Sequence, residues 1–66
     1  MFTPEQKFVV TPVEGSGKFA TTRFSLREVL PTGKTRLATR KSFSEVDFAV
    51  NFAMNFGAEY GNIDTP

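Results

Sequence analysis

The chain has 66 residues, of which eight are basic and seven acidic, and it contains no cysteine and no histidine. Disulfides and thiolate metal sites are therefore excluded, and imidazole is missing both as a metal ligand and as a general base. This length supports one domain at most, which buries only about 60% of the surface of its unfolded chain. Eight phenylalanines supply most of the apolar mass, which is generous for so small a core.

The charges are unevenly distributed along the chain. Residues 18–41 hold seven of the eight bases and one acid, Glu28, which gives this stretch a net charge of +6. Residues 1–17 carry a net charge of −1, and residues 42–66 hold four acids and no base. A positive region flanked by acidic ends indicates an anionic partner.

The first half of the chain predicts two strands. Residues 7–13 are rich in β-branched and aromatic side chains, and Pro12 predicts that this strand lies at an edge or ends there. Residues 14–17 are a glycine-rich turn. Residues 18–30 are predicted to form the second strand, in which Phe24 and Leu26 alternate with polar side chains. The alternation slips at residues 28–30, where we expect a bulge or the end of the strand.

Residues 31–34, with the sequence Pro-Thr-Gly-Lys, predict a type I turn that closes a hairpin. A third strand is predicted over residues 35–41. Its alternation turns Arg36, Ala38 and Arg40 to one side and Leu37 and Thr39 to the other.

A helix is predicted after the third strand. Ser42 and Glu45 match a capping box, and Ser44 with Asp47 offers a second register. The helix is expected to run to about Phe56, with Gly57 as the residue that ends it.

The order of elements predicts an α+β fold in which a three-stranded antiparallel meander carries one C-terminal helix on one face. We expect residues 1–66 to form a single small domain. Residues 1–6 are a lead-in, and residues 58–66 are a tail that is loose or is held on the core by Tyr60 and Ile63. The expected core comprises Val10, Phe24, Leu26, Leu37, Val46, Ala49, Val50, Ala53 and Phe56.

The face of the sheet opposite the helix is predicted to be basic. If Phe24 and Leu26 point inward, Arg23 and Arg27 point outward, and Arg36 and Arg40 on the next strand can join them. Lys34 and Lys41 extend the positive region, and Phe19 offers a ring beside Arg23 for stacking. The alternative is that these side chains are an ordinary solvated face, with Phe19 packed over the first turn.

The helix carries more apolar surface than a three-stranded sheet covers. At 100° per residue its apolar side chains sweep an arc of roughly 200°, with Phe48 just outside it. One interpretation is that the strands curl around the helix and the tail covers the rest. The other is that Phe48, Phe52 and Met54 contact a second chain, most simply in a homodimer.

Catalysis has little support, because histidine, cysteine and paired carboxylates are missing. Gly33, Lys34 and Thr35 resemble the end of a phosphate-binding loop, but the glycine required five residues earlier is Glu28. No apolar run approaches the length of a membrane span, and no signal peptide is evident. We expect a cytoplasmic protein that is not an enzyme and binds no cofactor, metal or small-molecule substrate.

The strand over residues 23–29, the turn at 31–34, the basic strand at 36–41 and the helix start at 43–49 broadly resemble two groups of DNA-binding modules. These are the amino-terminal arm-binding domains of tyrosine recombinases and the ethylene-response domains of plants. The resemblance covers about half of the chain and implies that strand side chains read DNA. The phenylalanine-rich helix departs from both patterns.

The leading functional hypothesis is a small nucleic-acid-binding protein that is dimeric through its helix. Phosphate contacts are assigned to Arg23, Arg27, Lys34, Arg36, Arg40 and Lys41, with Phe19 as a stacking ring. The alternative is a protein-interaction module, such as a phage-type inhibitor or accessory subunit, that grips an acidic protein.

Overall fold

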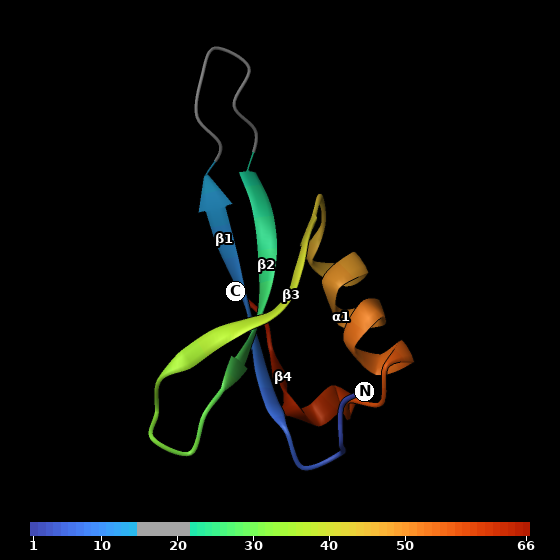
Figure 1. Ribbon diagram of the computed structural model, residues 1–66. Helices are drawn as coiled ribbons and strands as arrows, with labels where there is room; N and C mark the ends of the chain where they lie inside the picture. Colours follow the sequence, from blue (N-terminus) through green and yellow to red (C-terminus); the bar gives the residue numbers. More distant parts are fainter. Residues whose placement is uncertain (15–21) are drawn as a thin grey trace.

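The computed structural model describes residues 1–14 and 22–66 (Figure 1). It has the predicted α+β fold: three antiparallel strands in a meander, followed by a helix packed on the sheet. A short fourth strand, which the sequence did not predict, pairs parallel to the first, so the sheet order is β3-β2-β1-β4. The elements are β1 Lys7–Glu14, β2 Thr22–Val29, β3 Thr35–Phe43, α1 Val46–Asn55, the 3₁₀ helix Tyr60–Asn62 and β4 Ile63–Asp64. The glycine-rich turn, the start of the predicted second strand and Phe19 lie outside the described residues.

The hairpin turn between β2 and β3 is confirmed. The Gly33 N–H donates to the carbonyl of Leu30 at 2.9 Å, as a four-residue turn requires, and the Leu30 N–H donates to the carbonyl of Lys34 at 2.7 Å. Gly33 has a φ of +88°, a conformation that glycine adopts without steric cost. The turn therefore fixes the register with which β3 leaves β2.

The alternation predicted for the second strand is also confirmed, and the first strand alternates in register with it. Val10 lies opposite Leu26 and Phe8 opposite Glu28, and Phe8, Val10 and Leu26 are the largest fully buried side chains of the described residues. Glu28 shares this inward-facing side but lies near the end of β2, which explains why the alternation slips there. β2 ends one residue later, at Val29.

The register of β3 is regular over residues 35–37, where it puts Leu37 and Arg36 on the sides opposite to those expected, and it is interrupted beyond Leu37, so the predicted alternation does not continue there. Arg27 lies opposite Leu37, but Ser25 lies opposite Ser42, so one residue of β2 faces four residues of β3. These four residues, 38–41, form a bulge, and Figure 1 shows β3 crossing the sheet at a steep angle and then rising beside α1. Leu37 shares the side of Arg27, and its side chain is 53% exposed, so it is not a core residue.

The helix begins later than predicted. β3 continues to Phe43, which pairs with Phe24, so Ser42 is a strand residue and the capping box is wrong. α1 starts at Val46, so the cap position is Glu45 rather than Ser44, and the second register is wrong too; Glu45 itself makes no side-chain capping bond. The C-terminal stop at Gly57 is confirmed: its φ is +111°, and its N–H donates to the carbonyl of Met54 at 3.1 Å.

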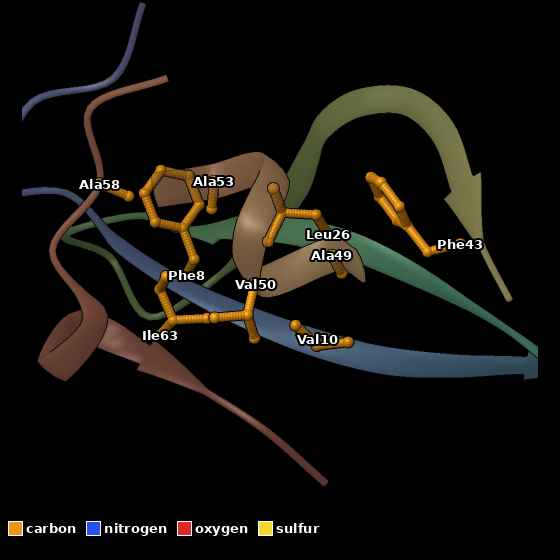
Figure 2. Packing of buried hydrophobic residues seen from close by; sticks show 9 residues of the cluster. All are labelled: Phe8, Val10, Leu26, Phe43, Ala49, Val50, Ala53, Ala58 and Ile63. Carbon is orange, nitrogen blue, oxygen red and sulfur yellow. The ribbon is translucent and has the colours of Figure 1, made fainter. Parts of the chain in front are cut away.

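The core lies between α1 and the inward side of the sheet (Figure 2). Five of the expected core residues are buried, and two others, Phe24 and Val46, are half-buried against them. Phe56 is 48% exposed and, like Leu37, does not belong to the core. Four further residues belong to the core: Phe8, Phe43 and Ala58, which were not predicted, and Ile63, one of the two residues expected to hold the tail on the core.

The two ends of the chain lie against this core. The Phe2 N–H donates to the carbonyl of Phe56 at 2.7 Å, and the Phe2 ring packs 4.6 Å from the Phe8 ring. The Asn62 side chain donates to the carbonyl of Pro4 at 2.7 Å, and Ile63 is buried beside β1, whereas Tyr60 is 69% exposed. The lead-in and the tail therefore contact each other at the end of the sheet where α1 stops.

Candidate anion-binding face

The side of the sheet that faces away from α1 is the candidate site and is called the open face below. Its members share the strand parity opposite to that of Phe8, Val10 and Leu26. They are Lys7, Val9, Thr11 and Val13 on β1, Arg23, Ser25, Arg27 and Val29 on β2, and Thr35, Leu37 and Ser42 on β3.

Two arginines stand on the open face, as predicted, and the same pair of contacts holds each of them. Arg23 donates from Nε to the hydroxyl of Ser42 at 2.7 Å and from Nη2 to the carbonyl of Ser42 at 3.0 Å. Arg27 donates from Nε to the hydroxyl of Thr35 at 2.9 Å and from Nη2 to the carbonyl of Thr35 at 3.3 Å. The two arginines are four residues apart on one strand, which separates them by about 13 Å.

These contacts have a structural consequence. Thr35 precedes the bulge of β3 and Ser42 follows it, so the two guanidinium groups tie β3 to β2 on both sides of the interruption. A guanidinium has five N–H donors, and each of these interactions uses two of them. Three donors on each group remain available for an anion that approaches the open face.

Arg36 does not join this pair, so the predicted gathering of four arginines on one face is wrong. The register puts Arg36 opposite Glu28, on the parity of the helix side. Its Nε and Nη2 atoms both lie 2.9 Å from Oε1 of Glu28, and the Gln6 side chain donates to Oε2 at 2.8 Å. The hydrogen bond from Gln6, and then the Arg36 guanidinium, hold the pKa of Glu28 below its ordinary value of 4.5 despite partial burial. One base of the positive region is thus paired with its only acid.

The other basic residues are spread around the sheet. Lys34 is exposed in the turn between β2 and β3, and Arg40 and Lys41 are exposed in the bulge. The Lys41 ammonium lies 5.7 Å from the centroid of the Phe52 ring, on the helix side of the molecule. The bulge therefore turns Lys41 away from the open face, which the period-2 reading of β3 could not anticipate.

The open face also carries aliphatic side chains that the sequence analysis missed. Val13 is 49% exposed and Leu37 53% exposed, and Leu37 lies directly opposite Arg27. No aromatic ring belongs to this face within residues 1–14 and 22–66. Asp64 of β4 lies beside Val9 and adds one negative charge at the margin. This face therefore combines two hydrogen-bonded arginines and the exposed Lys7, which was not predicted, with an apolar surface, and it lacks a stacking ring in its described part.

The residues predicted as a dimer contact lie on two separate flanks of α1. Phe52 is half-buried and packs 5.4 Å from the Phe43 ring and 4.6 Å from the Phe56 ring. Phe48 is 52% exposed and Met54 44% exposed, but about 120° of helix separates them at 100° per residue. Phe48 and Phe52 of α1 and Phe56 directly after it follow one another at intervals of four residues along one side, which is called the aromatic flank below. Met54 is on the other side, so the three predicted residues do not form one patch.

Other kinds of site find no basis in the part of the chain that the structure describes. Within it, no three side chains of the acidic, histidine or cysteine type gather where they could hold a metal ion. No described helix has the length and hydrophobicity that crossing a membrane requires.

Comparison with known proteins finds no family model, no curated protein and no solved structure that matches this chain. Its own residues are therefore the basis for any functional argument.

Proposed function

We propose that this protein binds nucleic acid through the open face of its sheet, with Arg23 and Arg27 contacting backbone phosphates. The observation that carries the proposal is the matched geometry of these two side chains. Each guanidinium is held by a hydroxyl and a carbonyl of β3 and keeps three donors for a further acceptor. Arginine that is already ordered loses less side-chain entropy on binding a phosphate than a free side chain does.

The charge distribution supports the same proposal. Residues 18–41 keep a large positive excess even though Glu28 neutralises Arg36, and an excess of this kind raises the local concentration of an anionic polymer. Because the described part of the open face has no ring, the proposed contacts there are to phosphates, which carry no sequence information. Binding through this face is accordingly expected to be sequence-independent and strongly weakened by salt.

The test compares two substitutions that remove one positive charge each from opposite sides of the sheet. Arg27→Gln should weaken binding to a fluorescently labelled 20-base-pair duplex and lower the slope of log K against log salt by about 0.9. Arg36→Gln, which removes a base already paired with Glu28, should leave that slope unchanged. Thr35→Val removes a hydroxyl that holds Arg27 but keeps the charge, so it reports the structural part of any loss. If both arginine variants lower the slope equally, or if the wild-type protein fails to bind at low salt, the proposal is wrong.

A second candidate is an interaction module for an acidic protein, and the exposed aliphatic residues favour it. Leu37 and Val13 share the open face with the arginines, and protein interfaces combine arginine with apolar side chains more than phosphate contacts require. A single stoichiometric protein that the chain retains from nuclease-treated lysate, and that Leu37→Ser releases, would favour this candidate over nucleic acid.

A further inference from the structure

The aromatic flank of α1 presents rings to solvent beside a positive charge. Phe48 is 52% exposed and Phe56 48% exposed, and the Lys41 ammonium lies 5.7 Å from the ring of Phe52 between them. Successive members of the flank are four residues apart, so their positions rise by about 6 Å each time along the helix. The open face has cations without rings, whereas the aromatic flank has both.

We propose that the aromatic flank is a stacking surface for the bases of single-stranded nucleic acid, with Lys41 contacting the phosphate that connects them. This inference deepens the proposed nucleic-acid binding and rests on it. Surfaces that bind single strands without sequence preference combine exposed aromatic faces with positive charge that follows the backbone. Paired bases are already stacked in a duplex, so this surface selects unpaired strands.

The contacts of the rings indicate which of them can accept a base. Phe52 is half-buried between Phe43 and Phe56, and its free side faces Lys41, so it anchors the flank and positions the ammonium. Phe56 packs against Phe52 on one side and lies 6.3 Å from Phe2 on the other, yet keeps about half of its surface. Phe48 is the most exposed of the three and is the principal stacking residue in this proposal. Glu45, exposed just before α1, carries a negative charge near that end, so the phosphates are expected on the Lys41 side.

A second copy of the chain fits the aromatic flank less well than a nucleic acid does. Phe48 and Phe56 together expose about the surface of one phenylalanine, roughly 200 Å², whereas a stable interface buries about 800 Å² on each partner. In a symmetric pair centred on Phe52, the two Lys41 ammonium groups would also approach each other near the symmetry axis and repel. The same positive charge attracts a phosphate.

The experiment measures the affinity of the full chain for labelled 20-nucleotide oligo(dT) and for the 20-base-pair duplex at low salt. Phe48→Ala should weaken oligo(dT) binding by about 5-fold to 100-fold, the range of one lost base stack, and leave duplex binding unchanged. Phe48→Trp should restore oligo(dT) binding. Met54→Ala, on the other flank and of similar exposure, is the matched control and should change neither affinity. Lys41→Gln should lower the salt slope for oligo(dT) by about 0.7.

The possible outcomes separate this inference from the proposed function. If Phe48→Ala lowers oligo(dT) affinity while Arg27→Gln changes no affinity, the aromatic flank is the site and the open-face proposal is wrong. Unchanged oligo(dT) affinity in a folded Phe48→Ala variant, with circular dichroism as the check on folding, overturns the inference. Light scattering that shows a dimer in the wild type and a monomer in Phe48→Ala, with oligo(dT) binding unchanged, would assign the flank to a second copy instead.

Discussion

Gly57 lies just after α1 and against the backbone of Phe2, near the start of the chain. Replacing it by alanine should lower the free energy of unfolding by an unusually large amount. Its φ of +111° is a conformation that residues with a side chain rarely adopt. A Cβ atom built there would overlap the carbonyl oxygen of Phe2 and lie 3.3 Å from its carbonyl carbon. Both obstacles are backbone, so no rotation of a side chain relieves them, and the lead-in must move.

The magnitude follows from these two effects. Backbone strain at such a φ costs about 1–3 kcal/mol. Displacing the lead-in also loses the hydrogen bond from Phe2 to Phe56, about 1 kcal/mol, and the half-burial of the Phe2 ring, about 1 kcal/mol more. Gly57→Ala should therefore lower the free energy of unfolding by roughly 3–5 kcal/mol. A domain of this size has only about 3–10 kcal/mol in total, so the variant should be marginally folded.

Two other glycines provide controls for a urea titration followed by far-ultraviolet circular dichroism. Gly33→Ala meets a positive φ of +88° but has nothing within 4 Å of the added atom, so it should cost only about 1–2 kcal/mol. Gly61→Ala has open space and no positive φ, and should change stability by less than about 0.5 kcal/mol. Removing residues 1–3 should bring the cost of Gly57→Ala down to that of Gly33→Ala. Equal costs at Gly57 and Gly33 in the intact chain would refute the claim that the lead-in is clamped against the helix end.

Three further predictions concern the sheet. Leu26→Ala should destabilise by about 2–5 kcal/mol, whereas Leu37→Ala should cost less than about 0.5 kcal/mol, and similar losses in denaturant titrations would contradict the register of β3. Because the folded-state pKa of Glu28 is lowered, its stabilisation is complete above its ordinary pKa of 4.5 and is lost as the pH falls through the lower folded-state value. The stability gap between the wild type and Glu28→Gln should therefore narrow on acidification, and a gap that stays constant from pH 6 to pH 2 would exclude this role. β4 pairs only with Phe8 and Val9, so the rest of β1 is an edge with no partner strand in the described part of the sheet. Pro12 lies in this unpaired stretch and has no backbone N–H to offer another strand. Pro12→Val should increase concentration-dependent association in light scattering, and a monodisperse variant would show that the proline does not protect the edge.

The fold class was predictable from the sequence because its signals are local. The Pro-Thr-Gly-Lys turn, the alternation around Phe24 and Leu26, and the glycine after the helix each depend on a few neighbouring residues. The second half of β3 was not predictable, because nothing in residues 38–43 indicates that four of them will face one residue of β2. The sides of Leu37 and Arg36 follow from the hairpin turn, which places Leu37 opposite Arg27 and Arg36 opposite Glu28 ahead of the irregularity. Beyond the irregularity β3 continues to Phe43, so Ser42 of the predicted helix cap is a strand residue. The basic face was predicted in part: Arg23 and Arg27 lie on regular β2, whereas Arg36 and Lys41, which do not join them, lie on β3.

The bulge also determines how the positive charge is used. Had β3 continued from the turn without a bulge, the register that pairs Arg27 with Leu37 would have placed Lys41 directly opposite Arg23 on the open face, where the two positive charges repel each other. The observed register gives each cation a different environment: Arg36 meets Glu28, Lys41 lies over Phe52, and Arg23 and Arg27 hold the strand on either side of the interruption. The arginines of the open face are thus needed for the sheet even when no partner is bound.

Their structural and binding roles separate experimentally, because Arg27→Lys keeps the charge but cannot reproduce the two directed bonds to Thr35. It should lower stability, as measured by urea titration, and preserve the salt slope of nucleic-acid binding, whereas Arg27→Gln should lower both. If Arg27→Lys instead lowers the salt slope as much as Arg27→Gln does, the fixed geometry of the guanidinium, rather than its charge, is what the partner recognises.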